Sequence, residues 1–260
     1  MKLLVTGGCG YKGSVLIPLL LADGHSVTSI DTQWFGNALP EHPQLTNLKL
    51  DVRDTDAIPL NGVEAIIHLA NIANDPAVEL NPTLSWEVNV LAGQQLVDRA
   101  VRAGVKHFLF ASSGSVYGVK DEPQVTEDLT LVPISVYNKT KMVAERVFLS
   151  YADQMQVHCI RPATVCGLSP RMRLDVSVNM LTYQGLKNGK ITVFGGEQTR
   201  PNIHIQDMAN VYRHFLAHRE LPSGCYNAGF ENLKILEIAQ RVQQGTGAEI
   251  VVSESNDPRS

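Results

Sequence analysis

Three glycines near the N-terminus constrain the fold of this chain more than any other feature. Gly7, Gly10 and Gly13 are spaced G-x-x-G-x-x-G, between an apolar run at residues 2–5 and a helix-compatible stretch at residues 14–23. Glycine at these positions lets the chain turn tightly, lets the backbone approach a pyrophosphate and lets the following helix pack on a sheet. The first turn of that helix would present free N–H groups and a positive dipole end to the phosphates. The pattern therefore predicts a dinucleotide site at the first strand-to-helix turn.

The part of the chain that follows repeats this alternation of strand and helix. Short β-branched runs end in turn residues, and longer stretches with one apolar face separate them, which is typical of βαβ units on a parallel sheet. We expect strands at residues 26–30, 48–50, 65–69, 106–111 and 156–160, and helices at residues 84–103 and 139–151. The predicted fold class is α/β, with a doubly wound parallel sheet of the Rossmann type.

The alternation is lost after the sixth predicted strand, which indicates a change in organisation. We expect a dinucleotide-binding domain over residues 1–165 and a smaller, mainly substrate-binding lobe over residues 166–260. Segments near residues 201–218 and 225–228 are candidates to return to the first domain. A C-terminal lobe of this kind would cover the carboxyl ends of the strands, where doubly wound folds bind their ligands.

Composition excludes several other classes of protein. Of the 260 residues, 44% are hydrophobic and 18% are charged, which is enough apolar material for a core and too little charge for disorder. A net charge of −4 and a pI near 6.1 argue against a nucleic-acid partner, and no apolar run is long enough for a membrane partner or span. Because the four cysteines are scattered without metal-ligand spacing, we expect a reduced, cytoplasmic protein without a metal site or structural disulfides.

Asp31 favours NAD over NADP as the dinucleotide. It follows the predicted strand at residues 26–30 and lies 18 residues after Gly13. A carboxylate at this place accepts hydrogen bonds from the adenosine ribose hydroxyls and would repel a 2′-phosphate. A helix cap or a turn residue is the simpler alternative for an aspartate at a strand end.

A second group of residues carries acid–base chemistry. Tyr137 and Lys141 are four residues apart, and this spacing puts them on one face of a helix. A phenol with a pKa of about 10 is a poor base at neutral pH unless a cation stabilises its phenolate, and we expect Lys141 to do so. Ser113, just after the fifth predicted strand, is expected to hydrogen-bond the same substrate oxygen. Tyr-x-x-x-Lys also occurs by chance on solvated helices, but its combination with the glycine loop and Ser113 argues against chance.

At this point the chain resembles the extended short-chain dehydrogenase/reductases, specifically the NAD-dependent sugar-nucleotide epimerase/dehydratase group. The resemblance extends from residue 2 to at least residue 228. The matching segments are residues 6–13, 51–53, 68–71, Asn89, 112–118, Tyr137 with Lys141, Arg161 with Pro162, and 200–207.

The resemblance implies which residues contact NAD, the cofactor. These are Gly7, Gly10, Tyr11, Lys12, Gly13, Asp31, Asp51, Val52, Leu69, Ala70, Asn71, Asn89, Tyr137, Lys141 and Pro162. It selects Ser113 over Ser112 and Ser115 as the catalytic serine, together with Tyr137 and Lys141. For a nucleoside-diphosphate sugar as substrate, the candidates are Ser113, Thr164, Arg173 and Arg200, with Arg171 and Arg259 as further candidates for the phosphates.

Departures from the family pattern narrow the predicted reaction. Gly114 and Ser115 stand where the resembling 4,6-dehydratases carry Asp-Glu, so that acid–base pair is absent from this place. Cys166 and Thr164 replace the Tyr and Asn that are common after the sixth strand, and this changes the expected substrate contacts. We expect an NAD-dependent nucleotide-sugar epimerase that acts at C4 through a transient 4-keto sugar.

Two other functions stay open at this level. A dehydrogenase or reductase of the same family would release the keto product, and a non-catalytic nucleotide-sensing protein could use the same fold. The resemblance also implies a homodimer that pairs the helices at residues 84–103 and 139–151. It names neither the sugar nor the nucleotide base.

Overall fold

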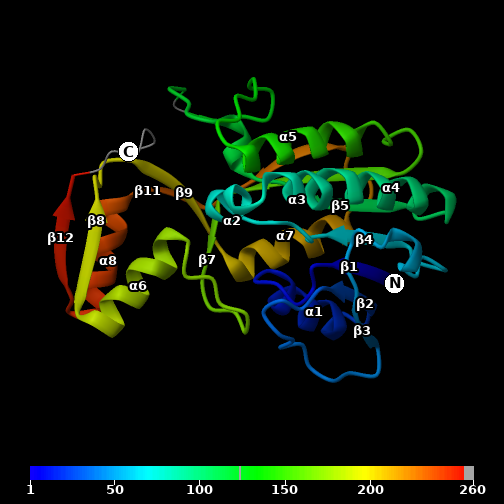
Figure 1. Cartoon of the computed structure of the whole chain (residues 1–260), viewed down its shortest axis with the longest axis horizontal. Coiled ribbons are helices and arrows are strands. Elements are labelled where there is room, and N and C mark those ends of the chain that lie inside the picture. The colour runs from blue at the N-terminus through cyan, green and yellow to red at the C-terminus, as the bar shows by residue number, and fades with distance from the viewer. Residues whose placement is uncertain (123, 255–260) are drawn as a thin grey trace.

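A seven-stranded parallel sheet forms the centre of the molecule in the computed structural model, which describes residues 1–122 and 124–254 (Figure 1). The strand order is β10-β6-β5-β4-β1-β2-β3, and every neighbouring pair is parallel. The strands are β1 (Lys2–Thr6), β2 (Ser26–Asp31), β3 (Leu45–Lys49), β4 (Ala65–His68), β5 (His107–Ala111), β6 (Gln156–Pro162) and β10 (Gly224–Ala228). Their carboxyl ends therefore meet at one edge, and the predicted doubly wound sheet is confirmed.

Helices cover both faces of this sheet, because successive residues of a strand point to opposite sides. In β1, Leu3 and Val5 pack with α1 (Gly13–Ala22) and α7 (Ile205–Ala217) on one face. Leu4 packs on the other face, in the same core cluster as residues of α4 (Ala92–Arg102) and α5 (Val136–Leu149). The sheet is thus buried on both sides, as its nearly continuous apolar strands predict.

The long helix expected at residues 84–103 is interrupted. The structure has α3 (Pro82–Trp86), then a π-helical turn at Glu87–Leu91, and then α4. A π turn inserts one residue into a helical turn and is frequent at functional sites. Here it contains the buried side chain of Asn89, which hydrogen-bonds Ile72 and Thr140.

Two other boundaries differ from the sequence prediction. A short helix, α2 (Asp75–Leu80), follows β4, where no helix was expected from the sequence. It forms because the Asn74 side chain accepts a hydrogen bond from Ala77 N and Pro76 suits a first helical turn. The third strand begins at Leu45 rather than at residue 48, since it pairs with β2 along its length. Short 3₁₀ turns, η1 (Thr55–Ala57) and η3 (Gly114–Tyr117), complete the main body.

A smaller lobe lies at the left of Figure 1 and has an apolar core of its own. It contains α6 (Ser177–Asn188), β8 (Lys190–Phe194), α8 (Ile235–Thr246) and β12 (Glu249–Ser253), and β8 pairs with β12. A three-stranded sheet joins it to the main body, with β9 (Thr199–His204) between β7 (Thr164–Cys166) and β11 (Glu231–Lys234). Arg259 lies outside the described residues, and no described helix is long and apolar enough to cross a membrane.

Replacement of Phe148 by alanine tests the packing between α5 and the sheet. Phe148 is fully buried, and its ring lies 4.9 Å from that of Phe108 and 4.7 Å from that of Phe110, centroid to centroid. Phe148→Ala should lower the free energy of unfolding by about 3–5 kcal/mol, measured by urea denaturation, because a cavity replaces the ring. The matched control Phe230→Ala, at an 80% exposed ring, should change it by less than about 0.5 kcal/mol. Equal effects of the two substitutions would contradict this packing.

Candidate active site

The glycine loop leaves no room for side chains where it bends over the sheet. Gly7 has φ +72°, and a Cβ there would lie 2.6 Å from Ala70 N. A Cβ on Gly13 would lie 2.4 Å from Gly8 O, so the start of α1 packs directly on the loop. Gly10 donates its N–H to Gly7 O at 3.1 Å. The loop therefore brings bare backbone to the first turn of α1, where an anionic group is favoured.

Polar groups from β2 and from the chain after β4 flank this loop. The Asp31 carboxylate accepts hydrogen bonds from Cys9 N at 3.0 Å and Gln33 N at 2.7 Å. Ala70 donates its N–H to Thr6 Oγ1 at 3.2 Å, which places the segment from Leu69 to Asn71 against the end of β1. Asn71 Oδ1 is buried without a hydrogen-bond partner among the described residues. A buried acceptor without a partner points to a ligand donor.

Three cations gather beside the first turn of α1. Burial and the nearby charge of Arg173 lower the pKa of Lys12 to about 8. Burial, and then the charge of Lys12, lower the pKa of Lys141 well below its usual range. Like charges this close in a partly desolvated site favour the arrival of an anion. A pyrophosphate fits this environment.

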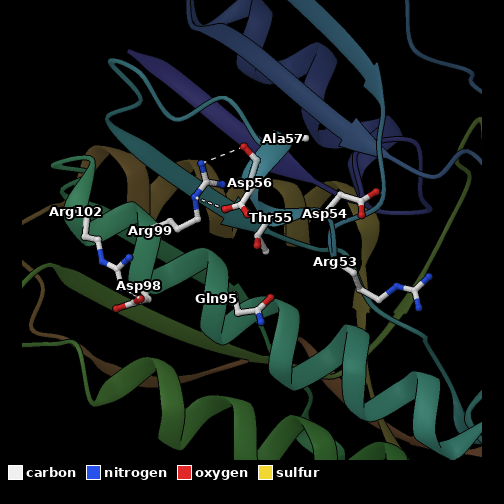
Figure 2. A pocket seen from close by; sticks show the side chains of 9 residues that line it. All are labelled: Arg53, Asp54, Thr55, Asp56, Ala57, Gln95, Asp98, Arg99 and Arg102. Atoms are coloured by element: carbon white, nitrogen blue, oxygen red, sulfur yellow. Dashed lines mark hydrogen bonds and ion pairs between the residues drawn. The ribbon is translucent and has the colours of Figure 1, made fainter.

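Asp51 and Val52, two of the expected NAD contacts, lie near a surface pocket. Val52 is buried, and the Asp51 carboxylate accepts a hydrogen bond from Arg53 Nη2 at 2.8 Å. A pocket of about 700 Å³ lies between this segment and α4. Figure 2 shows the side chains that line it. Its three arginines each pair with a carboxylate: Arg53 with Asp51 and Glu87, Arg99 with Asp56, and Arg102 with Asp98. Because these charges are already compensated, we assign the pocket no role in the site.

Ser113 and Tyr137 lie together at the carboxyl edge of the sheet. Ser113 follows β5, and its Oγ lies 2.7 Å from Ser115 Oγ and accepts a hydrogen bond from Ser115 N at 3.2 Å. Tyr137 is in the first turn of α5, where Ser135 caps the helix. Burial raises the pKa of the Tyr137 phenol, while the charge of Arg173 and the nearby Ser113 hydroxyl each act to lower it. The pair can hold one substrate hydroxyl between them.

The effect of Lys141 on the Tyr137 phenol stays a prediction. Lys141 Nζ donates to Ala111 O at 2.6 Å and lies 5.9 Å from the centre of the Tyr137 ring, because its ammonium turns toward the end of β5. Burial raises the pKa of Tyr137 above its usual value, and the cation that opposes this increase is Arg173. A negative charge on Asp75 adds to the increase.

A buried ion pair between β6 and α5 holds the elements that carry these side chains. Arg161, near the end of β6, donates from Nε and Nη2 to the two carboxylate oxygens of Glu145 at 2.9 and 2.8 Å. Both side chains are at most 5% exposed. Ser112 Oγ also donates to Glu145, and Arg161 Nη1 donates to the Tyr117 hydroxyl at 2.8 Å. The network ties α5 to β5, η3 and β6, and so fixes the catalytic candidates relative to one another.

Asn89 and Pro162, two of the predicted NAD contacts, make bonds or close contacts with the elements around Ser113 and Tyr137. Asn89 donates to Ile72 O and Thr140 Oγ1 and accepts from Ile72 N, so its amide joins the chain after β4 to α5. Pro162 ends β6, and a Cβ on Gly114 would lie 3.1 Å from its carbonyl oxygen. Asn89 thus holds the chain after β4 against α5, and its contact with NAD stays a prediction.

The predicted substrate residues fall in two groups. Thr164 on β7 pairs in register with Asn202 on β9, and Arg200 lies two residues earlier on β9. Residues in register on neighbouring strands share a face, so Thr164 and Arg200 lie on one face of the connecting sheet. Arg173 instead lies in the segment after β7, within electrostatic reach of Tyr137.

This arrangement of a glycine loop, an acidic end of β2 and a Ser/Tyr/Lys group at one sheet edge defines a dinucleotide-dependent redox site. The family model described as "NAD dependent epimerase/dehydratase family" matches residues 3–229. The chain therefore belongs to the NAD-dependent epimerase/dehydratase family.

Named relatives agree with this assignment. UDP-glucose 4-epimerase of Lactobacillus helveticus is 28% identical over 96% of this chain and 83% of its own length. The structure of MoeE5 in complex with UDP-glucuronic acid and NAD is 28% identical, with a TM-score of 0.86 over 98% of this chain and 85% of the other. The Thermus thermophilus UDP-glucose 4-epimerase complex with NAD is 25% identical, with a TM-score of 0.86 over 100% of this chain and 88% of the other.

NAD is the cofactor of this family, and the described residues fit it. The tight backbone at Gly7 and Gly13, the buried acceptor on Asn71 and the cations near α1 suit its pyrophosphate and polar groups.

Some residues near the site were not predicted from the sequence. Glu145 lies four residues after Lys141 on α5, and this spacing alone was a usable signal. Asn179 and Asp175 carried no such signal. Asn179 donates to Tyr11 Oη at 3.1 Å and Arg173 O at 2.9 Å, and Asp175 pairs with the Arg173 guanidinium at 2.6 Å.

The lowered pKa of Lys12 predicts how NAD affinity depends on pH. A bound pyrophosphate favours the charged ammonium, so NAD binding above pH 8 requires proton uptake by Lys12. Affinity should fall about tenfold between pH 7 and pH 9, measured by titration calorimetry. Lys12→Met should bind NAD more weakly at pH 7 and lose most of this dependence. An unchanged pH dependence in the variant would assign the effect to another group.

Proposed function

We propose that this protein is an NAD-dependent nucleotide-sugar epimerase that inverts C4 through a transient 4-keto sugar. The observation that carries the proposal is the placement of Ser113 just after β5 and of Tyr137 and Lys141 on α5, where Lys141 Nζ donates to Ala111 O at the end of the same strand. Relatives and solved neighbours that are named as UDP-sugar epimerases support the same reaction.

Bound NAD would supply the hydride acceptor and, after the sugar turns, the hydride donor. In the first half-reaction the Tyr137 phenolate takes the proton of the C4 hydroxyl while the C4–H bond breaks. Ser113 hydrogen-bonds the same oxygen and orients it. In the second half-reaction Tyr137 returns the proton to the oxygen of the inverted centre, so no proton or hydride is consumed overall.

The environment of Tyr137 explains why the phenolate base would form only when NAD is bound. Burial keeps the phenol neutral in this structure, since its pKa is raised. Arg173 and the positive charge of bound oxidised nicotinamide would both stabilise the phenolate. Lys141 would hold the nicotinamide ribose from its place at the end of β5. The base would then form when the cofactor is in place.

Two alternatives have different requirements. A dehydrogenase or reductase releases the keto sugar and must exchange its cofactor at every turnover, whereas an epimerase regenerates NAD internally. A nucleotide-sensing protein needs no Ser113, Tyr137 and Lys141 together. Conversion of UDP-glucose or UDP-glucuronic acid by purified protein without added NAD, followed by NMR, distinguishes the three: only the epimerase gives the C4-inverted sugar catalytically.

Replacement of Tyr137 by phenylalanine tests the base. Tyr137→Phe keeps the ring and its packing, so the fold and NAD binding should persist while turnover falls about 10²–10⁴-fold. Wild-type turnover should also decrease as the pH falls through the phenol's pKa, because the phenolate is the active form. Ser113→Ala should cost less, since the base stays in place. Near-normal turnover by Tyr137→Phe would refute this mechanism.

Replacement of Arg200 by alanine tests the substrate side. An arginine that binds the diphosphate contributes a charge-assisted hydrogen bond, so Arg200→Ala should weaken nucleotide-sugar binding about 10- to 100-fold. NAD affinity, measured by calorimetry, should stay within about twofold. The control is Arg241→Ala, at an arginine on α8 that pairs with Glu231. Parallel losses of NAD and sugar binding would show that Arg200 is structural.

We also propose that the protein is a homodimer and that it is cytoplasmic. Exposed apolar side chains on the helices after β4 support the dimer: Leu80 is 89% exposed, Trp86 37% and Leu91 53%. A twofold pairing of this face would bury them. Four free cysteines suit a reducing compartment. Light scattering of the purified protein tests the dimer.

A further inference from the structure

The segment at residues 167–175, which follows β7 and leads into α6, crosses from the small lobe to the loops of the cofactor site; we call it the strap. Its first residue is fixed by packing. Gly167 has φ +118°, and a Cβ there would lie 2.5 Å from His204 Nε2. Gly167 N also donates to Asn179 Oδ1 at 2.9 Å. The strap therefore starts from a rigid base rather than from a loose linker.

The strap is bonded to the glycine loop. Tyr11 Oη donates to Gly167 O at 2.8 Å, and Ser169 Oγ donates to Tyr11 O at 2.8 Å. Ser169 Oγ also lies 2.9 Å from Ser14 Oγ, in the first turn of α1. These bonds connect the strap to the turn that would hold the pyrophosphate.

Two further contacts reach the other cofactor loops. The Arg171 guanidinium lies over the Phe35 ring, 3.9 Å from its centroid, in the loop after β2. Asn74 Nδ2 donates to Asp175 Oδ2 from the loop after β4. Phe35 is 72% exposed, so the strap rather than the core holds its ring. The strap thus contacts the glycine loop, the loop after β2 and the loop after β4, which adjoin the predicted NAD contacts.

The backbone is constrained where two of these loops leave their strands. Gln33, just after β2, has φ +57°, and Asn74, after β4, has φ +72°. Left-handed conformations of non-glycine residues are costly and persist where the surroundings fix them. Asn74 is itself a strap contact, and Gln33 lies two residues before Phe35.

We propose that the strap retains bound NAD, and that the stack of Arg171 on Phe35 sets how fast the cofactor leaves. For NAD to escape, the loops after β2 and β4 must separate from the glycine loop, and the strap bonds resist this. Slow release suits an enzyme that regenerates its cofactor in each turnover. The inference rests on the proposed function for this advantage, but release itself does not require epimerisation.

NADH fluorescence measures the release directly. Protein loaded with NADH is mixed with excess NAD in a stopped-flow instrument, and the loss of bound NADH fluorescence gives the dissociation rate. Arg171→Met and Phe35→Leu should each raise this rate about two- to fivefold, which corresponds to one exposed cation–π contact. The double variant should release NADH no faster than the faster single variant, because both substitutions remove the same contact.

The matched control is Lys187→Met. Lys187 Nζ lies 5.5 Å from the centre of the Tyr183 ring on α6, a cation–π contact in the small lobe outside the strap. Its loss should leave the rate unchanged. Three results would overturn the proposal. The first is a release rate of Arg171→Met and Phe35→Leu within 1.5-fold of wild type, which is about the resolution of such a comparison. The others are additive effects in the double variant and no measurable NADH binding.

Epimerisation of UDP-glucose by the same samples separates this proposal from the proposed function. Strap-dependent release in a wild-type protein that does not epimerise would support retention and contradict the function. Epimerisation by a protein whose NADH release rate does not change in the strap variants would support the function and contradict retention.

Discussion

The ion pair between Arg161 and Glu145 is the interaction on which the catalytic geometry depends. Two charges buried this deeply are stable only when their hydrogen bonds are satisfied, and removal of either partner leaves an uncompensated charge. Here Ser112 and Tyr117 complete the bonding. Since Glu145 lies on α5 and Arg161 on β6, the pair fixes the helix that carries the phenol relative to the ends of the strands. Sites built on rigid elements in this way are more precise than sites on loops.

The cofactor side of the site is organised by charge rather than by a buried pair. Lys12, Lys141 and Arg173 stand near one another, and burial lowers the pKa of both lysines. An anionic dinucleotide relieves this repulsion, so its binding and the protonation of the site are linked. The strap then connects the same region to the small lobe, and the sheet that joins this lobe to the main body carries Arg200. The proposed cofactor retention and the proposed substrate binding would therefore be connected through one segment of chain.

Much of the fold could be predicted from the sequence because it depends on local patterns. The glycine spacing, the apolar strands and the four-residue interval between Tyr137 and Lys141 each have a direct physical reading. The helix α2 was open to this kind of prediction, since its cap by Asn74 and its Pro76 are local signals. The π turn at Asn89 was not, since tertiary hydrogen bonds to Ile72 decide it. Local propensity carries no record of such contacts.

The residues of the site were easier to predict from the sequence than the charges that act on them. Tyr137, Ser113 and Lys141 do gather at one edge, but the direction of the Lys141 ammonium depends on the carbonyl of Ala111, which the sequence does not reveal. The cation nearest in effect to the phenol comes from residue 173, 36 positions later in the chain. Long-range charge depends on how the strap folds back, and spacing along the chain does not determine that.

The central claim is that hydride leaves C4 and returns to the same sugar without exchange. A mixture of two substrates tests it directly by mass spectrometry. One is UDP-glucose that is deuterated at C4, and the other is UDP-glucose without deuterium that carries ¹³C throughout the ring. The account predicts that, in the C4-inverted product, deuterium stays with the ¹²C sugar, with no transfer to the ¹³C sugar and no loss to solvent. Deuterium in the ¹³C product, its loss to water, or stoichiometric accumulation of NADH would contradict the account.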